Sequence, residues 1–228
     1  MGSQNSLTIR LENLCLDVDT ASGGRRRILH PLTCRITERT VAVVGANGSG
    51  KSTLLRLLAG LEVPSGGEVR FDPPQPRVGF IFANPQAQIV MPVVREDVEF
   101  SLKQAGVPRA ERSPRAQQVL HEFGLGDLAE SSVYEVSSGE RQKLALAGVL
   151  AAQPQLVLAD EPTTLLDLRS AAEFQRRLLA LPVTLIVATH DLDFAARAER
   201  VIVFDDGAPV FDGDAAEGIA AYRRLALG

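Results

Sequence analysis

A phosphate-binding loop is the clearest chemical signal in the chain. Residues 45–52 read GANGSGKS, which fits the pattern of a glycine, four variable residues and then Gly-Lys-Ser. Glycines let consecutive backbone N–H groups turn toward phosphate oxygens, and the helix that follows presents its positive end to the same charge. Lys51 would reach the terminal phosphates, and the Ser52 hydroxyl would ligate Mg²⁺. We predict that a nucleoside triphosphate is bound by Gly45, Asn47, Gly48, Ser49, Gly50, Lys51, Ser52 and Thr53.

Two acidic residues, Asp160 and Glu161, follow the apolar run LVLA. At the end of a strand beside a phosphate loop, Asp160 can hold the Mg²⁺ shell, and Glu161 is placed to polarise a water molecule for attack on the γ-phosphate. Alone, two such acids are more often a charge pair at a helix N-terminus. The phosphate loop reverses that preference. We therefore predict Ser52 and Asp160 as metal ligands and Glu161 as a catalytic residue.

His190 and Asp191 end a third apolar run, VTLIVAT. A lone histidine is more often structural than catalytic. This one, however, follows a strand that should lie in the same parallel sheet, and ligands gather at the carboxyl ends of such strands. We therefore predict that His190 is a catalytic residue that contacts the γ-phosphate.

Alternating strands and helices must position these residues. The run TVAVV at 40–44 ends at the phosphate loop, and the helical pattern LLRLLAGL follows the loop. The alternation predicts an α/β fold with a mainly parallel sheet, helices on both faces and a helical insertion from about 94 to 151. Further strands are expected at 7–16, 32–36, 68–71, 77–82, 155–159, 183–188 and 200–204, and helices at 95–102, 109–123, 140–152, 169–180 and 193–197.

The composition excludes some classes of protein. The chain has 228 residues, of which 45% are hydrophobic and 23% charged, as is typical of a globular protein. Its net charge of −4 argues against a nucleic-acid-binding face, and we expect the basic residues 25–27 to lie in a solvated loop. Cys15 and Cys34 lack the spacing of a metal site or a disulfide framework, so we expect two buried thiols in a reducing compartment.

The chain also lacks the patterns of a membrane-spanning or secreted protein. No stretch approaches the roughly 20 apolar residues that span a bilayer, and the first residues lack the charged and apolar regions of a signal peptide. We expect a soluble, cytoplasmic protein. The small polar residues 1–6, MGSQNS, are either a flexible natural start or a cloning remnant.

Four motifs resemble, in order, those of the nucleotide-binding subunit of ATP-binding cassette (ABC) transporters. They are GANGSGKST, VSSGERQKLALAGVLA, LVLADEPTTLLD and VATHDLDFA, and together they span nearly the whole chain. The resemblance implies ATP and Mg²⁺ as cofactors, and a phosphate-loop (RecA-like) core with an N-terminal antiparallel β subdomain and a helical subdomain. We expect one ATPase domain over 1–228, with the core and β subdomain in 1–88 and 154–228 and the helical subdomain in 89–153.

The resemblance also implies that two such subunits act together. In the family, the segment corresponding to Val136–Glu140 is a signature usually written LSGGQ, which contacts the nucleotide of the other subunit, so that each ATP is sandwiched within a homodimer or heterodimer. Backbone N–H groups at a helix start suit such an anion contact, although a serine there also serves as an ordinary N-cap. In TTLLD, Asp167 matches the loop that links the two sites. The residues implied are Ser137, Ser138, Gly139, Glu140 and Asp167.

A further segment, FANPQAQIVMPVVREDVEFSL, resembles that of energy-coupling-factor importers, which take up B vitamins, nickel or cobalt. This resemblance implies a transmembrane coupling protein and a substrate-capture membrane protein as partners, with the ATPase bound at the cytoplasmic face of the membrane and no nucleic acid involved. The chain ends without the C-terminal extension of many such ATPases, so we expect a short form. The short length of the chain and the segment IVMPVV favour a biotin importer, with cobalt or nickel as alternatives.

Two departures from the family concern nucleotide contacts. Ser138 and Glu140 stand where the signature has glycine and glutamine, so that Glu140 either adds negative charge near the partner's triphosphate or faces the helix surface. No aromatic residue lies near residues 16–19 to stack on adenine, and Val18 is the nearest counterpart. Adenine stacking is therefore expected to be weak or supplied elsewhere.

A third departure is Ala83. The family has a glutamine directly after this strand, reaching Mg²⁺ and the attacking water, whereas alanine has no donor or acceptor. Either Gln86 or Gln88 substitutes for it, or hydrolysis is slow and depends on a partner subunit. We expect reduced hydrolysis with ATP binding retained, because the phosphate loop and Asp160 are intact.

Two other functions compete with transport. A soluble ABC ATPase could act on ribosomes, DNA repair or iron–sulfur assembly, but the single cassette, the lack of a basic face and the importer-like segment weigh against it. A small phosphate-loop kinase would need an arginine-rich lid over its substrate's phosphate and has no use for VSSGER or TTLLD. The motif set favours the transporter ATPase.

Overall fold

A six-stranded sheet forms the centre of the computed structural model, which describes residues 7–21 and 23–227. The question of a natural or added start at residues 1–6 lies outside the described residues. The strand order is β5-β6-β7-β3-β8-β9, parallel throughout except for β9, which runs antiparallel to β8. Its strands are β3 (Thr40–Gly45), β5 (Val78–Ile81), β6 (Leu156–Asp160), β7 (Thr184–Ala188), β8 (Arg200–Asp205) and β9 (Ala208–Gly213).

A second, three-stranded sheet is built from the N-terminal part of the chain. Its order is β2-β1-β4, and both pairings are antiparallel. The predicted α/β fold with an antiparallel N-terminal sheet and a mainly parallel core sheet is thereby confirmed. The strands are β1 (Thr8–Asp19), β2 (Arg25–Ile36) and β4 (Gly66–Asp72).

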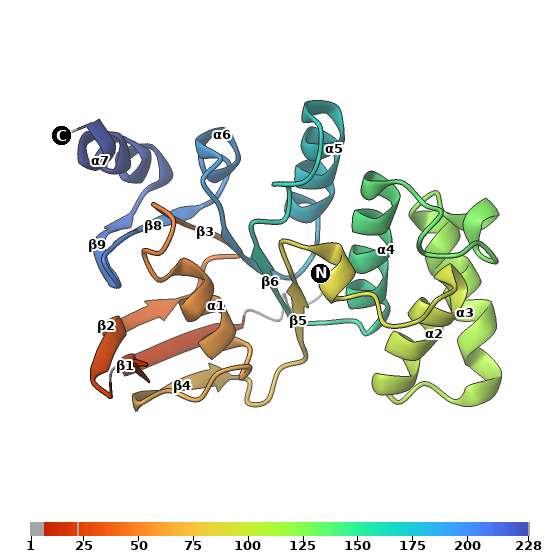
Figure 1. Ribbon diagram of the computed structural model, residues 1–228, viewed down its shortest axis with the longest axis horizontal. Helices are drawn as coiled ribbons and strands as arrows, with labels where there is room; N and C mark the ends of the chain where they lie inside the picture. The colour runs from red at the N-terminus through yellow and green to blue at the C-terminus, as the bar shows by residue number, and fades with distance from the viewer. Residues whose placement is uncertain (1–6, 22, 228) are drawn as a thin grey trace, which may run out of the picture.

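Seven helices and two short 3-10 turns connect the strands in the described chain (Figure 1). α1 lies between the two sheets. α2 to α4 lie at the β5 end of the core sheet, and α5 to α7 lie along the face of the core sheet that is opposite to α1. The helices are α1 (Lys51–Leu58), α2 (Val94–Gln104), α3 (Arg109–Glu122), α4 (Ser138–Ala151), α5 (Leu168–Leu179), α6 (Leu192–Ala195) and α7 (Ala215–Leu227), with 3-10 turns at Pro85–Ala87 and Gly126–Leu128.

The core sheet separates two hydrophobic clusters. Successive side chains of a strand point to opposite faces, so that Val41 and Val43 of β3 join one cluster and Ala42 and Val44 the other. The first cluster holds α1 and the three-stranded sheet, and the second holds residues of α2 to α7. A strand buried on both faces reads as a continuous apolar run, which is why TVAVV predicted β3 correctly.

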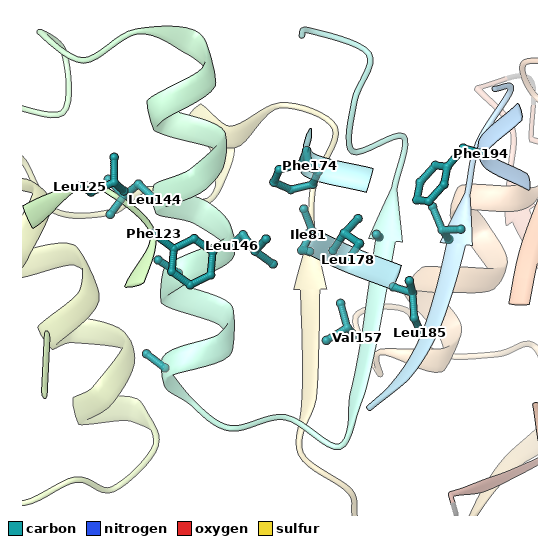
Figure 2. Close-up of a cluster of buried hydrophobic side chains, with 14 of the residues drawn as sticks. Ile81, Phe123, Leu125, Leu144, Leu146, Val157, Phe174, Leu178, Leu185 and Phe194 are labelled. Carbon is teal, nitrogen blue, oxygen red and sulfur yellow. The ribbon is translucent and has the colours of Figure 1, made fainter. Parts of the chain in front are cut away.

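Helix α4 joins the helical end of the molecule to the core sheet. Figure 2 shows Leu144 turned toward Leu125 and Leu146 turned toward Ile81 of β5. All four side chains are at most 1% exposed. Truncating either leucine to alanine would cost about 2 to 5 kcal/mol, so the signature segment at the start of α4 sits on a firmly packed helix.

Some expectations about local structure were wrong. Arg25–Arg27 lie in β2 rather than in a loop, and the Arg27 guanidinium bonds the Asp17 carboxylate at 2.7 and 3.0 Å. β2 is an edge strand, where exposed charged residues are common and hide the apolar alternation. Cys15 and Cys34 are free thiols as expected, but both are half-buried rather than buried.

Two elements near the end of the chain escaped prediction. β9 has the sequence APVFDG, with a proline and a glycine, and α7 begins AAEGIAAY, where small residues weaken the helical pattern. Both are defined by packing against β8, with which they make their main contacts. No helix in the described chain is long and apolar enough to cross a bilayer.

Candidate functional site

The phosphate loop connects the buried strand β3 to α1, as its pattern predicts. A Cβ atom at Gly45 would lie 2.4 Å from the Phe204 carbonyl oxygen, so this position admits only glycine. Gly48 and Gly50 have φ angles of 81° and 101°, in the left-handed region that glycine enters without strain. The buried Ser49 hydroxyl oxygen has no hydrogen-bond partner among the described residues, which fits a loop shaped around an external anion.

The Lys51 side chain bonds back to the start of the phosphate loop. Its ammonium donates to the Gly45 carbonyl at 2.7 Å and to the Ala46 carbonyl at 3.0 Å, which leaves one of three protons for a ligand. Burial lowers the pKa of Lys51, while the carboxylates of Glu161 and Asp160 act in the opposite direction. A desolvated ammonium at a helix start favours an incoming phosphate.

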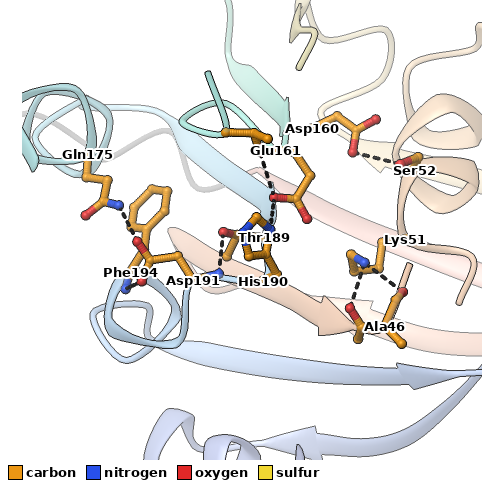
Figure 3. A network of polar contacts seen from close by, with 12 residues as sticks. Ala46, Lys51, Ser52, Asp160, Glu161, Gln175, Thr189, His190, Asp191 and Phe194 are labelled. Atoms are coloured by element: carbon orange, nitrogen blue, oxygen red, sulfur yellow. Dashed lines mark hydrogen bonds and ion pairs between the residues drawn. The ribbon is translucent and has the colours of Figure 1, made fainter. Parts of the chain in front are cut away.

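Ser52 and Asp160 meet at the same edge of the sheet (Figure 3). The Ser52 hydroxyl donates to Asp160 Oδ1 at 2.8 Å, and Asp160 is 7% exposed at the end of β6. Mg²⁺ prefers oxygen ligands and is bound through one or two such groups together with substrate phosphates. The donor set therefore fits the magnesium ion that the sequence implies.

Glu161 and His190 form the next layer of the site. His190 Nδ1 lies 2.7 Å from Glu161 Oε2, and the histidine side chain is 61% exposed (Figure 3). The other carboxylate oxygen, Glu161 Oε1, is buried and has no partner among the described residues. Such an orphan acceptor is suited to a water molecule that must lose a proton.

Two adjoining cavities cover these groups, and both are lined by Asn47 and Glu161. One, of about 340 Å³, runs along the phosphate loop to Thr53 and also touches Arg26 and Ile28 of β2. The other, of about 450 Å³, is lined by Gly45, Ala46, Asn47, Ala83, Glu161, Thr164, His190 and Tyr222. The predicted phosphate-loop, acidic and histidine residues thus lie together.

Three lining residues outside the four sequence motifs were missed from the sequence: Arg26, Ile28 and Tyr222. None belongs to a phosphate-binding motif, and each reaches the cavities only through sheet pairing or helix packing. Val18, the expected counterpart of the adenine-stacking residue, pairs in register with Arg26 and is 39% exposed. Of these two neighbours, Arg26 is the one that lines the phosphate-loop cavity.

The signature segment lies apart from the phosphate loop of its own chain, because Ser137, Ser138, Gly139 and Glu140 line neither cavity. Ser137 is the N-cap of α4, and its hydroxyl and backbone N–H each lie 2.7 Å from Glu140 Oε2 in a capping box. These hydrogen bonds from Ser137 lower the pKa of Glu140. Glu140 therefore folds back on the helix start instead of extending along the helix surface.

Asp167 also lines neither cavity and caps a helix of its own chain. Its carboxylate accepts from the backbone N–H groups of Arg169 and Ser170 and from the Ser170 hydroxyl at 2.7 Å, and these bonds lower its pKa. Beside it, Leu165 and Leu168 are 56% and 92% exposed. Large apolar side chains at such exposure suggest a surface that is covered by another chain.

Neither glutamine near Ala83 replaces the missing amide. Gln88 donates to the Ala145 carbonyl at 3.0 Å and receives the Phe82 N–H at 3.4 Å, so it ties the loop to α4. Gln86 lines a different cavity, beside Tyr134 and Arg141. Of the two alternatives for the missing amide, these contacts favour slow hydrolysis over substitution by Gln86 or Gln88.

Comparison with known families decides what these motifs belong to. The family model described as ABC transporter matches residues 29–164, more than half of the chain. The chain belongs to the ABC transporter family. The resemblance expected from the four motifs is thereby confirmed.

Relatives place the chain among ATP-binding subunits of this family. The biotin transport ATP-binding protein BioM of Rhizobium etli is 42% identical over 94% of this chain and 99% of its own length. The BioM protein of Rhodobacter capsulatus is 37% identical over 86% of this chain and 87% of its own. The energy-coupling factor transporter ATP-binding protein EcfA1 of Lactiplantibacillus plantarum is 39% identical, covering 78% of this chain and 68% of its own.

Solved ABC structures share the whole fold. CbiO1 from Clostridium perfringens, described as part of the ABC transporter complex CbiONQ, superposes with a TM-score of 0.79 at 28% identity over 97% of this chain and 95% of its own. A dimeric ATP-binding cassette bound to ADP and phosphate gives a TM-score of 0.79 at 27% identity, covering 91% of this chain and 98% of its own. The chain is thus an ABC ATPase subunit.

Proposed function

We propose that this ABC ATPase energises an importer of the energy-coupling-factor type and that its substrate is a micronutrient, with biotin favoured. The observation that carries the ATPase part of the proposal is the joint placement of Lys51, the Ser52–Asp160 pair and the Glu161–His190 pair at one edge of the sheet. The relatives named for biotin transport and for the energy-coupling factor support the kind of importer. Nickel or cobalt remain alternative substrates.

The chain's own groups divide the hydrolysis of ATP between them. The phosphate loop and Lys51 hold the phosphates, and Ser52 and Asp160 would hold Mg²⁺, which when bound neutralises charge on the phosphate oxygens. Glu161 presents its unpaired oxygen to the attacking water and accepts its proton. His190 fixes the other oxygen of Glu161 at 2.7 Å and so orients the base.

The working form in this proposal is a dimer, either of two copies or with a second ABC ATPase. The cavities around the phosphate loop are not lined by the signature residues Ser137, Ser138, Gly139 and Glu140 of the same chain. The nucleotide that these residues are proposed to contact must therefore be one that is bound to a second subunit. Exposed Leu165 and Leu168 beside Asp167 offer apolar surface for the same contact. A related cassette of known structure is dimeric.

The proposed docking site for the transmembrane coupling protein is the groove beside residues 86–91. This cavity of about 140 Å³ is lined by Gln86, Ile89, Val90, Met91, Val133, Tyr134 and Arg141. Val90 and Tyr134 are 62% and 80% exposed, which is the profile of a protein-binding surface. The groove would place the ATPase at the cytoplasmic face of the membrane, where a separate membrane protein captures the substrate.

The proposal is tested by reconstitution. The chain is purified with a coupling membrane protein and a biotin-binding membrane protein in vesicles, and Mg²⁺-dependent ATP hydrolysis and biotin uptake are measured together. We expect ATP-dependent uptake that stops when Glu161→Gln replaces the wild-type chain. Recovery of the chain with RNA or with a soluble partner, and no stable membrane complex, would instead establish the non-transport alternative.

Ala83 is proposed to slow hydrolysis without weakening ATP binding, because it brings no hydrogen-bonding group to the cavity where Glu161 and His190 lie. Ala83→Gln should therefore raise the ATPase rate of the reconstituted complex by several-fold and leave the Kd for ATP unchanged. An unchanged rate in the presence of the membrane partner would refute this part of the proposal.

A further inference from the structure

The cavity on the terminal-phosphate side contains a side chain from α7, the last helix of the described chain. Tyr222 lines it together with Glu161, His190 and Ala83. Figure 1 shows α7 beside α6, which begins just after His190. A residue distant in sequence from the nucleotide motifs therefore reaches the space in which they act.

The ring and the hydroxyl of Tyr222 have different surroundings. The side chain is half-buried, and it packs against the larger hydrophobic cluster, as Phe211 of β9 also does. Within the described part of the chain, no hydrogen bond involves its hydroxyl. A phenol that packs through its ring and makes no hydrogen bond to the described chain keeps its O–H available as a donor to a ligand.

Ala83 and the two glutamines that follow it do not supply a hydrogen-bond donor at this position. Ala83 lines the same cavity without a donor or acceptor. Gln88 is bonded to the Ala145 carbonyl, and Gln86 lines the separate groove beside Tyr134. Tyr222 thus adds a neutral hydrogen-bond donor to a cavity where Glu161 and His190 are already paired with each other.

We infer that Tyr222 is a further residue of the ATP site and that its hydroxyl donates a hydrogen bond to the terminal phosphate of bound ATP. The inference rests on the proposed ATPase function. Because ADP lacks this phosphate, the contact favours ATP over ADP. It also makes the C-terminal helix a part of the nucleotide site rather than only a support for β8.

The test replaces Tyr222→Phe, which removes the hydroxyl and keeps the packed ring. We expect the Kd for ATP to rise by about 10- to 100-fold, the usual range for one hydrogen bond to a charged group. The Kd for ADP and the melting temperature should stay at their wild-type values. Leu225→Ala is the matched control, because Leu225 lies on the same helix, is 43% exposed and lines neither nucleotide cavity.

A second variant separates binding from packing. The inference is overturned if Tyr222→Phe binds ATP and ADP as the wild type does while Tyr222→Ala lowers the melting temperature, since Tyr222 would then serve packing alone. A wild-type chain that binds ATP over ADP but hydrolyses none would refute the proposed ATPase function and leave this binding test intact.

Discussion

The phosphate loop and the signature segment both offer backbone N–H groups at the start of a helix, yet they are prepared differently for an anion. The first turn of α1 contains no acidic residue, and Lys51 lies at its start with a proton to spare. The first turn of α4 contains Glu140, whose carboxylate already accepts the N–H and hydroxyl of Ser137. One helix start is open to a phosphate, and the other is occupied by an anion of its own chain.

This difference suggests an order of events in the proposed dimer. ATP can enter the phosphate loop of a single chain, because Lys51 and the orphan Ser49 hydroxyl are ready to receive it. Contact with a second chain's signature then requires Glu140 to release Ser137 or to remain near the triphosphate as a like charge. The four variants below break or sharpen this comparison.

The largest effect is expected from Glu161→Gln. The amide cannot accept the proton of the attacking water, so kcat should fall by about 10²- to 10³-fold while ATP binding is kept. Steady-state phosphate release and ATP titration measure the two quantities separately. Glu135→Gln, at an exposed carboxylate that lines no cavity, is the control. Equal loss of binding and hydrolysis would mean that Glu161 supports the loop rather than the reaction.

Lys51→Ala tests the open helix start itself. Removing a buried ammonium that faces the phosphate site should weaken ATP binding by about 100-fold, because charge-assisted hydrogen bonds to phosphate are lost. Titration calorimetry with ATP measures the change, and Lys103→Ala on the exposed side of α2 is the matched control. If the two variants bound ATP equally, the phosphate loop would not be the main ATP site.

Glu140→Gln tests the occupied helix start. Glutamine retains the capping geometry without the charge, so ATP-dependent dimerisation in a Glu161→Gln background should increase by about 3-fold with little loss of thermal stability. Sedimentation with and without ATP measures this, and Glu135→Gln again serves as the control. An unchanged dimer fraction would show that Glu140 lies away from the second nucleotide.

The stability of the same variant should depend on pH differently from that of the wild type. Hydrogen bonds from Ser137 lower the pKa of Glu140 in the folded chain, so their contribution to stability is present above the ordinary glutamate pKa and is lost as the pH falls through the lowered value. Acid unfolding of wild type and Glu140→Gln should therefore converge at low pH. Curves that stay parallel at all pH values would contradict this assignment.

The smallest effect is expected from Arg26→Ala, at the edge of the open site. Arg26 is exposed but lines the phosphate-loop cavity, so its loss should raise the Kd for ATP by only about 2-fold, and the difference should shrink at high salt. Arg25→Ala removes the neighbouring arginine, which pairs with Asp19 instead. Identical affinities of the two variants would remove Arg26 from the nucleotide site.

The sequence predicted the parts of the site that are local. The phosphate loop requires glycine conformations and a following helix within a few residues, so its pattern is visible in one stretch. Asp160 ends one buried parallel strand and His190 follows another, and the ends of such strands meet by the geometry of the sheet.

The remaining parts depend on packing between distant segments. Tyr222 reaches the cavity only because α7 packs against β8 and α6. Arg26 lines the phosphate-loop cavity only because β2 is longer than its apolar pattern suggests. The bond from Gln88 to α4 likewise depends on a contact between residues far apart in the chain. Local sequence patterns do not show which distant segments contact each other. The two missed elements, β9 and α7, depend on the same long-range packing.

The backbone of Glu161 bears on how the protein can be engineered. With a φ of 47°, this residue occupies the left-handed region, which costs a side-chain-bearing residue roughly 1 kcal/mol relative to glycine. Selection for thermal stability alone would therefore favour Glu161→Gly. The resulting protein would be more stable but inactive, because it lacks the carboxylate that accepts the proton. Thermostable versions of this chain are best sought at other positions, with turnover screened alongside melting temperature.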